Sequence, residues 1–299
     1  MTQARERVAL AAAGLVGIQV GAAIAGSRWV VHDLGPVSLA FVRYAVGLVS
    51  LLPFVLASRD RFGPMNLREG VTMAALGIAQ FGLLIALLNA GLTHLDAGLG
   101  ALLFATFPLL TLIIAAGIGR ERVDATLGAG VLLSIVGVGL ALGVRPPTLA
   151  PHELALGSAL VLASALCGAV CSVAYRPLLL RHGMLPMGAA AMGAAVLVLA
   201  PAAWAEGMAT RAPTLSTAQW AVVVAIGLSS GVAYWVWLWA LKHTSPTKAT
   251  TFMALSPVTA ALFGAFALGE TPGLGLVVGI VCILAGLRVV AARNVLPPT

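Results

Sequence analysis

Charged residues are scarce in this sequence. Only 9% of its 299 residues are Asp, Glu, Lys or Arg, whereas 60% are apolar. A soluble globular domain carries about 25% charged residues, because its surface faces water. This deficit excludes the soluble enzyme classes and predicts a protein that crosses the lipid bilayer several times.

Acidic residues and cysteines are missing where ion coupling or metal chemistry would use them. All 10 Asp and Glu residues lie between the apolar runs or at their ends. Carriers coupled to protons usually bury a carboxylate or a histidine, so a built-in proton relay is disfavoured. Cys167, Cys171 and Cys282 all lie inside apolar runs, which argues against a zinc site and a disulfide framework. We expect neither a metal nor a cofactor.

Enzymes and nucleic-acid binders find little support. The 5 histidines lie at the ends of apolar runs or between them, without a buried acid partner or an H-E-x-x-H motif. The basic residues behind the net charge of +7 are scattered between the runs, which suits membrane orientation rather than nucleic-acid binding. A membrane-embedded enzyme and a helper subunit are the alternatives of another class.

The apolar runs are long enough to be membrane-spanning helices, which need about 20 residues each. Charged or Pro- and Gly-rich breaks separate ten of them. They cover residues 8–27, 36–57, 69–91, 96–118, 124–144, 154–178, 185–206, 217–241, 247–268 and 273–292. If the N-terminus is cytoplasmic, most Lys and Arg residues fall on the cytoplasmic side, as the positive-inside rule requires. The charge bias therefore supports an even helix count and places both termini in the cytoplasm.

The two halves of the chain resemble each other weakly. Chemically distinctive residues recur at a spacing of 149 or 150. The pairs at 149 are His94 with His243, Pro108 with Pro257 and Glu121 with Glu270, and those at 150 are His32 with His182 and Pro36 with Pro186. Gly130 and Gly137 also match Gly279 and Gly286, and such small residues allow helices to pack closely.

We therefore predict an all-α integral membrane protein of ten helices, built of two five-helix repeats at residues 1–147 and 148–299. An odd number of helices places the second repeat upside down relative to the first. Inverted repeats are a recurring transporter design, with the substrate site between the repeats near the middle of the membrane. One chain then contains a whole transporter. We expect a functional monomer whose partners are a small-molecule substrate and the lipid bilayer.

Several motifs resemble the drug/metabolite transporter superfamily in its ten-helix, EamA-type form. The second half reads Tyr-Trp-Val-Trp-Leu-Trp-Ala-Leu-Lys-His from Tyr234 to His243, followed by Pro257 and by Leu-Gly-Glu ending at Glu270. The first half repeats this pattern more loosely around Pro108. The resemblance implies an exporter of small metabolites in the cytoplasmic membrane, and we favour the amino-acid exporter branch. Carriers of phosphorylated sugars, nucleotide sugars and drugs share the fold and are the alternatives.

Polar side chains in the middle of the predicted helices are candidates for substrate binding, because they are costly in lipid unless used or paired. Gln19 and Gln80 lie near the predicted midplane. Ser230 lies 150 residues after Gln80, so these two should face each other across the repeat axis. Such amides and hydroxyls would bind a polar or zwitterionic molecule. The alternative is hydrogen bonding between helices, which is common for these side chains.

Two aromatic residues, one arginine and two prolines complete the predicted site. Tyr234 and Trp237 are three residues apart, and we expect them to form an aromatic cavity wall. Arg43 lies well inside an apolar run, where it would hold a substrate carboxylate, snorkel outward or cap helix-end carbonyls, and of these the structural roles are favoured. Pro108 and Pro257 lie mid-helix at matched positions, and we expect each to kink its helix as a gate.

Overall fold

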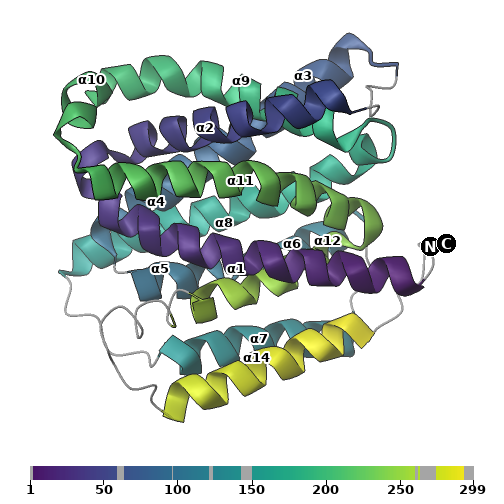
Figure 1. The fold of residues 1–299 in the computed structure, drawn as a ribbon. Helices are drawn as coiled ribbons and strands as arrows, with labels where there is room; N and C mark the ends of the chain where they lie inside the picture. The colour runs from purple at the N-terminus through teal and green to yellow at the C-terminus, as the bar shows by residue number, and fades with distance from the viewer. Residues whose placement is uncertain are drawn as a thin grey trace.

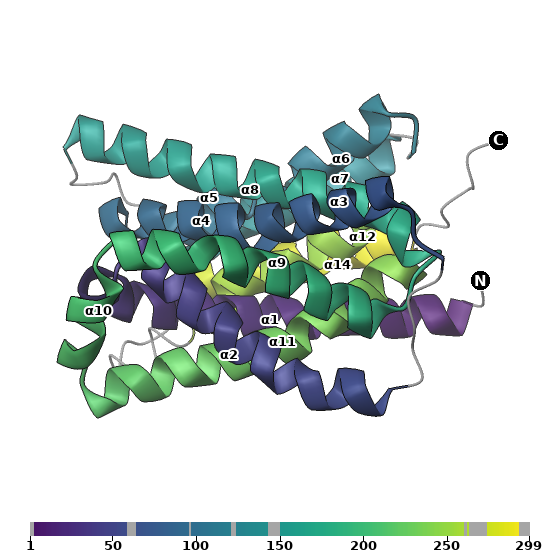
Figure 2. The same ribbon diagram turned by 90° about the horizontal axis from the view of Figure 1, so that it is seen from above.

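The computed structural model describes residues 3–58, 64–95, 97–120, 124–142, 150–259, 262 and 274–292. Within these residues all regular secondary structure is helical, as predicted. The long helices lie side by side with their axes in roughly the same direction (Figures 1 and 2). Such an arrangement lets many helices cross one membrane together.

Among the described residues, six helical segments are long and apolar enough to cross a membrane. They are α1 (Gln3–Leu34), α2 (Pro36–Ala57), the continuous segment Leu67–His94, α8 (Pro151–Leu179), α9 (Met184–Ala205) and α11 (Thr217–His243). Four shorter helices are α5 (Ala97–Phe104), α6 (Phe107–Gly117), α7 (Ala125–Leu142) and α14 (Leu274–Ala292). One turn of helix, α10 (Met208–Arg211), and the 3₁₀ turn η2 (Ala212–Thr214) join α9 to α11, and the apolar runs did not predict them.

Most predicted runs agree with these helices to within a few residues. The run 36–57 coincides with α2, because Gly35 takes a φ of 99° and Pro36 occupies the first helical turn. The first run is an exception, since α1 extends beyond 8–27 at both ends. The run 247–268 continues beyond the described residues. The count of ten helices and the orientation of the termini therefore stay predictions.

Three of the predicted helices are interrupted. The segment Leu67–His94 consists of α3 (Leu67–Gly77), the π-helical turn η1 (Ile78–Leu83) and α4 (Leu84–His94). The predicted helix 96–118 is broken at residues 105–106, between α5 and α6. In the second half, α12 (Pro246–Thr251) passes into the 3₁₀ turn η3 (Phe252–Ala254) before residues 255–259 return to α-helix. The last two interruptions lie just before Pro108 and Pro257.

α7 and α14 form a close pair along one side of the bundle (Figure 1). A Cβ atom on Gly130 would lie 3.1 Å from the carbonyl oxygen of Gly286, and one on Gly137 would lie 2.8 Å from that of Gly279. The two backbones therefore touch at the glycines, and the two helices run in opposite directions. This confirms that the matched small residues allow close packing.

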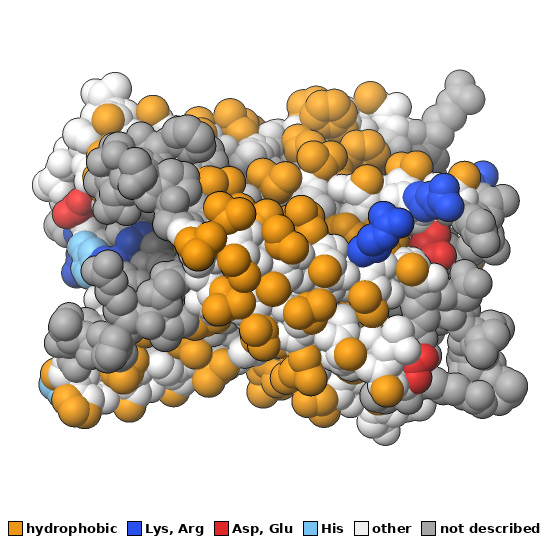
Figure 3. Space-filling model, turned by 90° about the horizontal axis from the view of Figure 1, so that it is seen from below, with side chains coloured by type: hydrophobic (Ala, Val, Ile, Leu, Met, Phe, Trp, Pro, Cys, Tyr) orange, Lys and Arg blue, Asp and Glu red, His pale blue; other side chains and the backbone are white. Residues whose placement is uncertain are grey.

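Large apolar side chains face outwards on the bundle. Leu15, Leu56 and Leu197 are exposed by 66%, 80% and 77%. Figure 3 shows hydrophobic side chains across the middle of one face, with charged side chains towards its two ends. Soluble proteins rarely expose so large an apolar area. The surface is thus consistent with an integral membrane protein surrounded by lipid.

Candidate binding pocket

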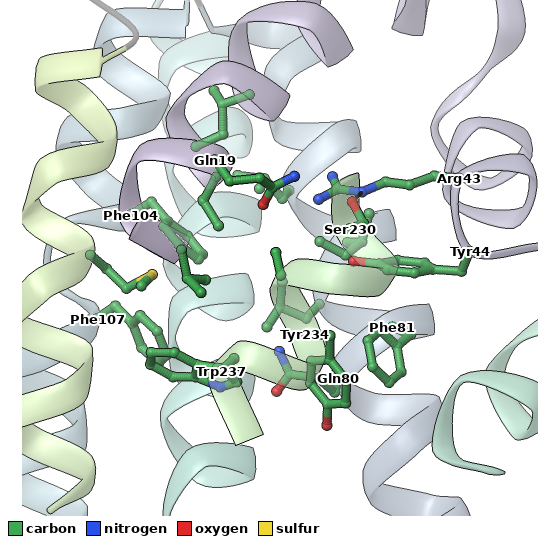
Figure 4. A pocket seen from close by; sticks show the side chains of 18 residues that line it. Gln19, Arg43, Tyr44, Gln80, Phe81, Phe104, Phe107, Ser230, Tyr234 and Trp237 are labelled. Atoms are coloured by element: carbon green, nitrogen blue, oxygen red, sulfur yellow. Dashed lines mark hydrogen bonds between the residues drawn. The ribbon is translucent and has the colours of Figure 1, made fainter. Parts of the chain in front are cut away.

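A pocket with a cavity volume of about 90 Å³ lies between helices of the two halves. All six residues that the sequence analysis assigned to substrate binding line it, and Figure 4 shows them. They are Gln19, Arg43, Gln80, Ser230, Tyr234 and Trp237. The other lining residues are Val16, Val20, Ile24, Tyr44, Phe81, Leu84, Ile85, Leu88, Phe104, Phe107, Ala233 and Met253. The structure brings the predicted residues together, and their binding of a substrate stays a prediction.

Two consecutive serines of α11 accept hydrogen bonds from the polar side chains on one side of the pocket. The Nε2 atom of Gln19 donates to the Oγ atom of Ser229 at 2.9 Å, and Nε of Arg43 donates to Oγ of Ser230 at 2.8 Å. Both serine hydroxyls donate in turn to the carbonyl oxygen of Ile226. Gln19 on α1 and Arg43 on α2 therefore point toward each other across the pocket (Figure 4). Each is fixed by a hydroxyl whose own helix orients it.

Aromatic rings form another wall. Tyr44 and Phe81 meet edge to face at 4.8 Å between ring centroids, and Phe81 meets Tyr234 at 4.3 Å. Tyr175 lies behind Tyr234 at 6.3 Å and does not line the pocket. Such edge-to-face contacts hold rings in fixed positions. The wall is therefore aromatic and held in place by ring contacts, and Trp237 continues it along α11.

Gln80 lies on the π turn η1. Its Oε1 atom is buried and has no hydrogen-bond partner among the described residues. A buried acceptor without a partner is unfavourable unless something else supplies the hydrogen bond. π turns inside α-helices are rare and occur frequently at functional sites. Gln80 thus places in the pocket wall a buried acceptor that has no partner among the described residues.

Sequence reasoning did not assign Phe81 to the pocket. A phenylalanine inside an apolar run carries no signal that separates a pocket-lining position from a packed or lipid-facing one. Ser229 was not assigned to the site, because only Ser230 lies 150 residues from Gln80. The adjacent serines were the signal available, since together they bind side chains on two other helices.

The prolines and the Leu-Gly-Glu motifs lie away from the pocket wall or beyond the described chain. Pro108 and Pro257 do not line the pocket, although Phe107 and Met253 near the two interruptions do. Their gating role stays a prediction. Glu121 and Glu270 lie outside the described residues.

Comparison with known proteins gives relatives of similar length. A protein of Streptantibioticus cattleyicolor, named "Probable terminal-alkyne amino-acid exporter", is 30% identical over 241 residues, which is 78% of this chain and 78% of that one. The "Uncharacterized inner membrane transporter YedA" of Escherichia coli K12 is 28% identical over 298 residues and 91% of each chain. The "Uncharacterized transporter YoaV" of Bacillus subtilis is 24% identical over 283 residues, 91% of this chain and 94% of that one. These names indicate transporters rather than enzymes.

A solved crystal structure shares the fold. It superposes with a TM-score of 0.74 and covers 95% of this chain and 97% of the other, at 20% sequence identity. The sequence matches the EamA-like transporter family twice, over residues 8–143 and 155–292. The two copies account for most of the chain and place it within the drug/metabolite transporter superfamily. The protein therefore belongs to the EamA-like transporter family.

Proposed function

We propose that this protein is a secondary transporter that exports amino acids, including aromatic and apolar ones, across the cytoplasmic membrane. The observation that carries the proposal is the meeting of polar and aromatic side chains from both halves in one pocket. The amides and Arg43 suit the polar end of an amino acid, and the aromatic wall suits an apolar side chain. Two relatives named as an amino-acid exporter and an inner membrane transporter support this choice.

Alternating access between two inverted repeats is the mechanism we propose. In an inverted pair, a contact between the halves recurs with the halves exchanged. The contacts of Gly130 with Gly286 and of Gly137 with Gly279 have this relation, because residues 149 apart change places. This supports two repeats at residues 1–147 and 148–299, with the pocket at their interface.

The interrupted helices are the proposed gates. The breaks before Pro108 and Pro257 lie at matched places, and both are next to pocket-lining residues. At both breaks the backbone passes through 3₁₀-type hydrogen bonds, whose geometry is poorer than that of an α-helix, so we expect the helices to bend there more easily. Among the described lining residues there is no Asp, Glu, Lys or His, so facilitated transport or exchange suits the pocket better than proton coupling. One chain builds the pocket, which fits a functional monomer.

Counterflow in liposomes containing only the purified protein tests the proposal. Liposomes are preloaded with unlabelled amino acids, and uptake of the labelled compound is measured without an ion gradient. We expect saturable uptake that falls at least several-fold in Trp237→Ala, which alters the pocket wall. Trp204→Ala is the matched control, because Trp204 on α9 is 69% exposed and lies outside the pocket.

The alternatives give different results in the same assay. Counterflow of phosphorylated sugars or nucleotide sugars alone would replace the amino-acid assignment. Uptake that never saturates and shows no counterflow would indicate a channel. If no compound is exchanged by folded protein, the proposed activity is wrong for these substrates, and a helper or enzyme role becomes the better hypothesis.

A further inference from the structure

Arg43 is a buried cation without an anionic partner in the described chain. Its side chain is only 6% exposed, yet no Asp or Glu of the described residues forms an ion pair with it. Its Nε atom donates to Ser230, and the guanidinium carbon lies 5.3 Å from the centroid of the Tyr44 ring. A buried guanidinium normally pairs with a carboxylate or phosphate, because desolvating the charge is costly.

A second buried cation among the described residues follows this rule. Lys248 on α12 is 1% exposed, and its Nζ atom donates to Oε1 of Glu6 at 2.8 Å. Lys248 is thus neutralised within the protein, whereas Arg43 is left to the pocket it lines. The difference suggests that the partner of Arg43 is supplied by the pocket's ligand.

The orientation of Arg43 is suited to a planar anion. Ser230 occupies Nε, so the two terminal nitrogens, Nη1 and Nη2, are the donors left for a ligand. Two parallel N–H donors match the two oxygens of a carboxylate. Gln19 faces the guanidinium from across the pocket (Figure 4), and one N–H of its amide is committed to Ser229. The second N–H of that amide is a further donor directed to the same region.

We propose that Nη1 and Nη2 of Arg43 bind the carboxylate of the transported molecule, with Ser230 as a positioning residue. The ligand class is a monocarboxylate with an apolar or aromatic body. None of the described lining residues is acidic, so no carboxylate is present to pair with an ammonium group of the ligand. We therefore expect binding not to require a free amino group. This inference rests on the proposed function, since it assigns the recognition chemistry of the same pocket.

Three probes separate the carboxylate from the amino group. Phenylalanine carries both groups, N-acetylphenylalanine carries only the carboxylate, and phenylalanine amide carries only the amino group. Binding to purified protein is read as the rise in unfolding temperature, and transport is read as counterflow. A charge-assisted bidentate contact is expected to favour the two acids over the amide by about 10- to 100-fold in apparent affinity.

Variants test the residues. In Arg43→Gln the preference for acid over amide should fall to less than about 3-fold, and Arg43→Lys should keep part of it, because a point charge lacks the bidentate fork. Ser230→Ala should lie between wild type and Arg43→Gln. Arg68→Gln is the matched control, because it makes the same change at an exposed position outside the pocket and should leave the preference unchanged.

Ligand-free stability distinguishes a binding role from a structural one. A buried charge without a partner is unfavourable, so Arg43→Gln should unfold at a temperature no lower than wild type. A large drop in that temperature would mean that Arg43 holds the fold together and would overturn the inference. The inference is equally wrong if the amide binds as well as the acids, or if phenyl phosphate binds and neither carboxylate does.

Failure of transport is distinguishable from failure of the subsite. If the acids raise the unfolding temperature in an Arg43-dependent way but none of the probes is exchanged, the subsite stands and the proposed function is wrong. If phenylalanine and its amide are exchanged equally well, the protein is a transporter and the subsite is wrong.

Discussion

Residues 94–108 and 243–257 occupy matched places in the two halves and are held in different ways. Each begins at a histidine that ends a long helix and passes through a short helix to an interruption just before a proline. In the second segment α12 is buried throughout. Lys248 within it is paired with Glu6 of α1, whose carboxylate also accepts from the hydroxyl of Thr244.

The first segment, residues 94–108, is held by an ion pair that lies nearer the surface. His94 forms an ion pair with Glu153 of α8, and His152 lies 3.3 Å from the other carboxylate oxygen. The side chains of His94 and Glu153 are 26% and 39% exposed, whereas that of Lys248 is 1% exposed. The comparison teaches that matched segments are held by ion pairs of unequal burial. In the proposed alternating mechanism, we expect the end that contains α12 to be the harder one to open.

The largest loss of stability is expected from a substitution at the backbone contact between α1 and the second segment. A Cβ atom on Gly21 would lie 2.2 Å from the carbonyl oxygen of Ser256, so Gly21→Ala forces two backbones apart. We expect a loss of about 3 kcal/mol in unfolding free energy, at the upper end for overpacking. Gly168→Ala on α8 is the matched control for the first segment.

In Gly168→Ala the new atom would meet only movable side-chain ends, Cδ1 of Leu84 at 2.8 Å and the ring of Phe107. The loss in unfolding free energy should therefore be clearly smaller than in Gly21→Ala. Unfolding in detergent followed by circular dichroism measures both variants. Equal losses would show that the two segments are packed alike and would remove the comparison.

Breaking the buried ion pair should have the next largest effect. Lys248→Met leaves the Glu6 carboxylate without its cation at a site where that side chain is 27% exposed. We expect a loss of about 2 kcal/mol, below the range for a fully buried pair because water reaches Glu6. The double variant Glu6→Gln with Lys248→Met, which removes both charges, should recover part of this loss of stability. No recovery would mean that Lys248 acts through packing rather than through its charge.

Replacing the prolines should change rates more than stability. Pro108 lies in the first turn of α6, where its missing N–H has no helical partner in any case. We expect Pro108→Ala and Pro257→Ala each to slow counterflow several-fold with little change in unfolding temperature. Pro201→Ala within α9 is the control, because it removes a proline from an uninterrupted helix. Unchanged rates in both variants would end the gating hypothesis.

The smallest loss of stability is expected at the surface pair, and it should depend on salt. The side chains of His94 and Glu153 are 26% and 39% exposed, so water and ions reach both. The loss in Glu153→Gln should therefore be small and should shrink as the salt concentration rises. The loss in Glu6→Gln should change less with salt, because its partner Lys248 is 1% exposed. Unfolding temperatures at low and high salt measure the difference.

Sequence reasoning located the helices and the pocket residues for identifiable reasons. Long apolar runs predict helices in lipid, and Pro36 marked the start of α2. Gln80 and Ser230 were paired through the repeat spacing, and both line the pocket. What escaped prediction depends on geometry between helices. The contact of Arg43 with Ser230 needs the relative rotation of α2 and α11, and the ion pair of Glu6 with Lys248 joins residues 242 positions apart.

The π turn η1 has a consequence for how the two halves differ. The third helix of each half begins with a capping box, at Asn66–Glu69 and Ser216–Gln219, and ends at His94 or His243. These helices hold 28 and 27 residues, and a π turn takes in one residue more than an α turn. The π turn thus takes up the extra residue of the first helix, while its capping box and its terminal histidine keep the places of their counterparts in α11. The same turn carries the amide of Gln80 into the pocket wall, where α11 contributes the hydroxyl of Ser230.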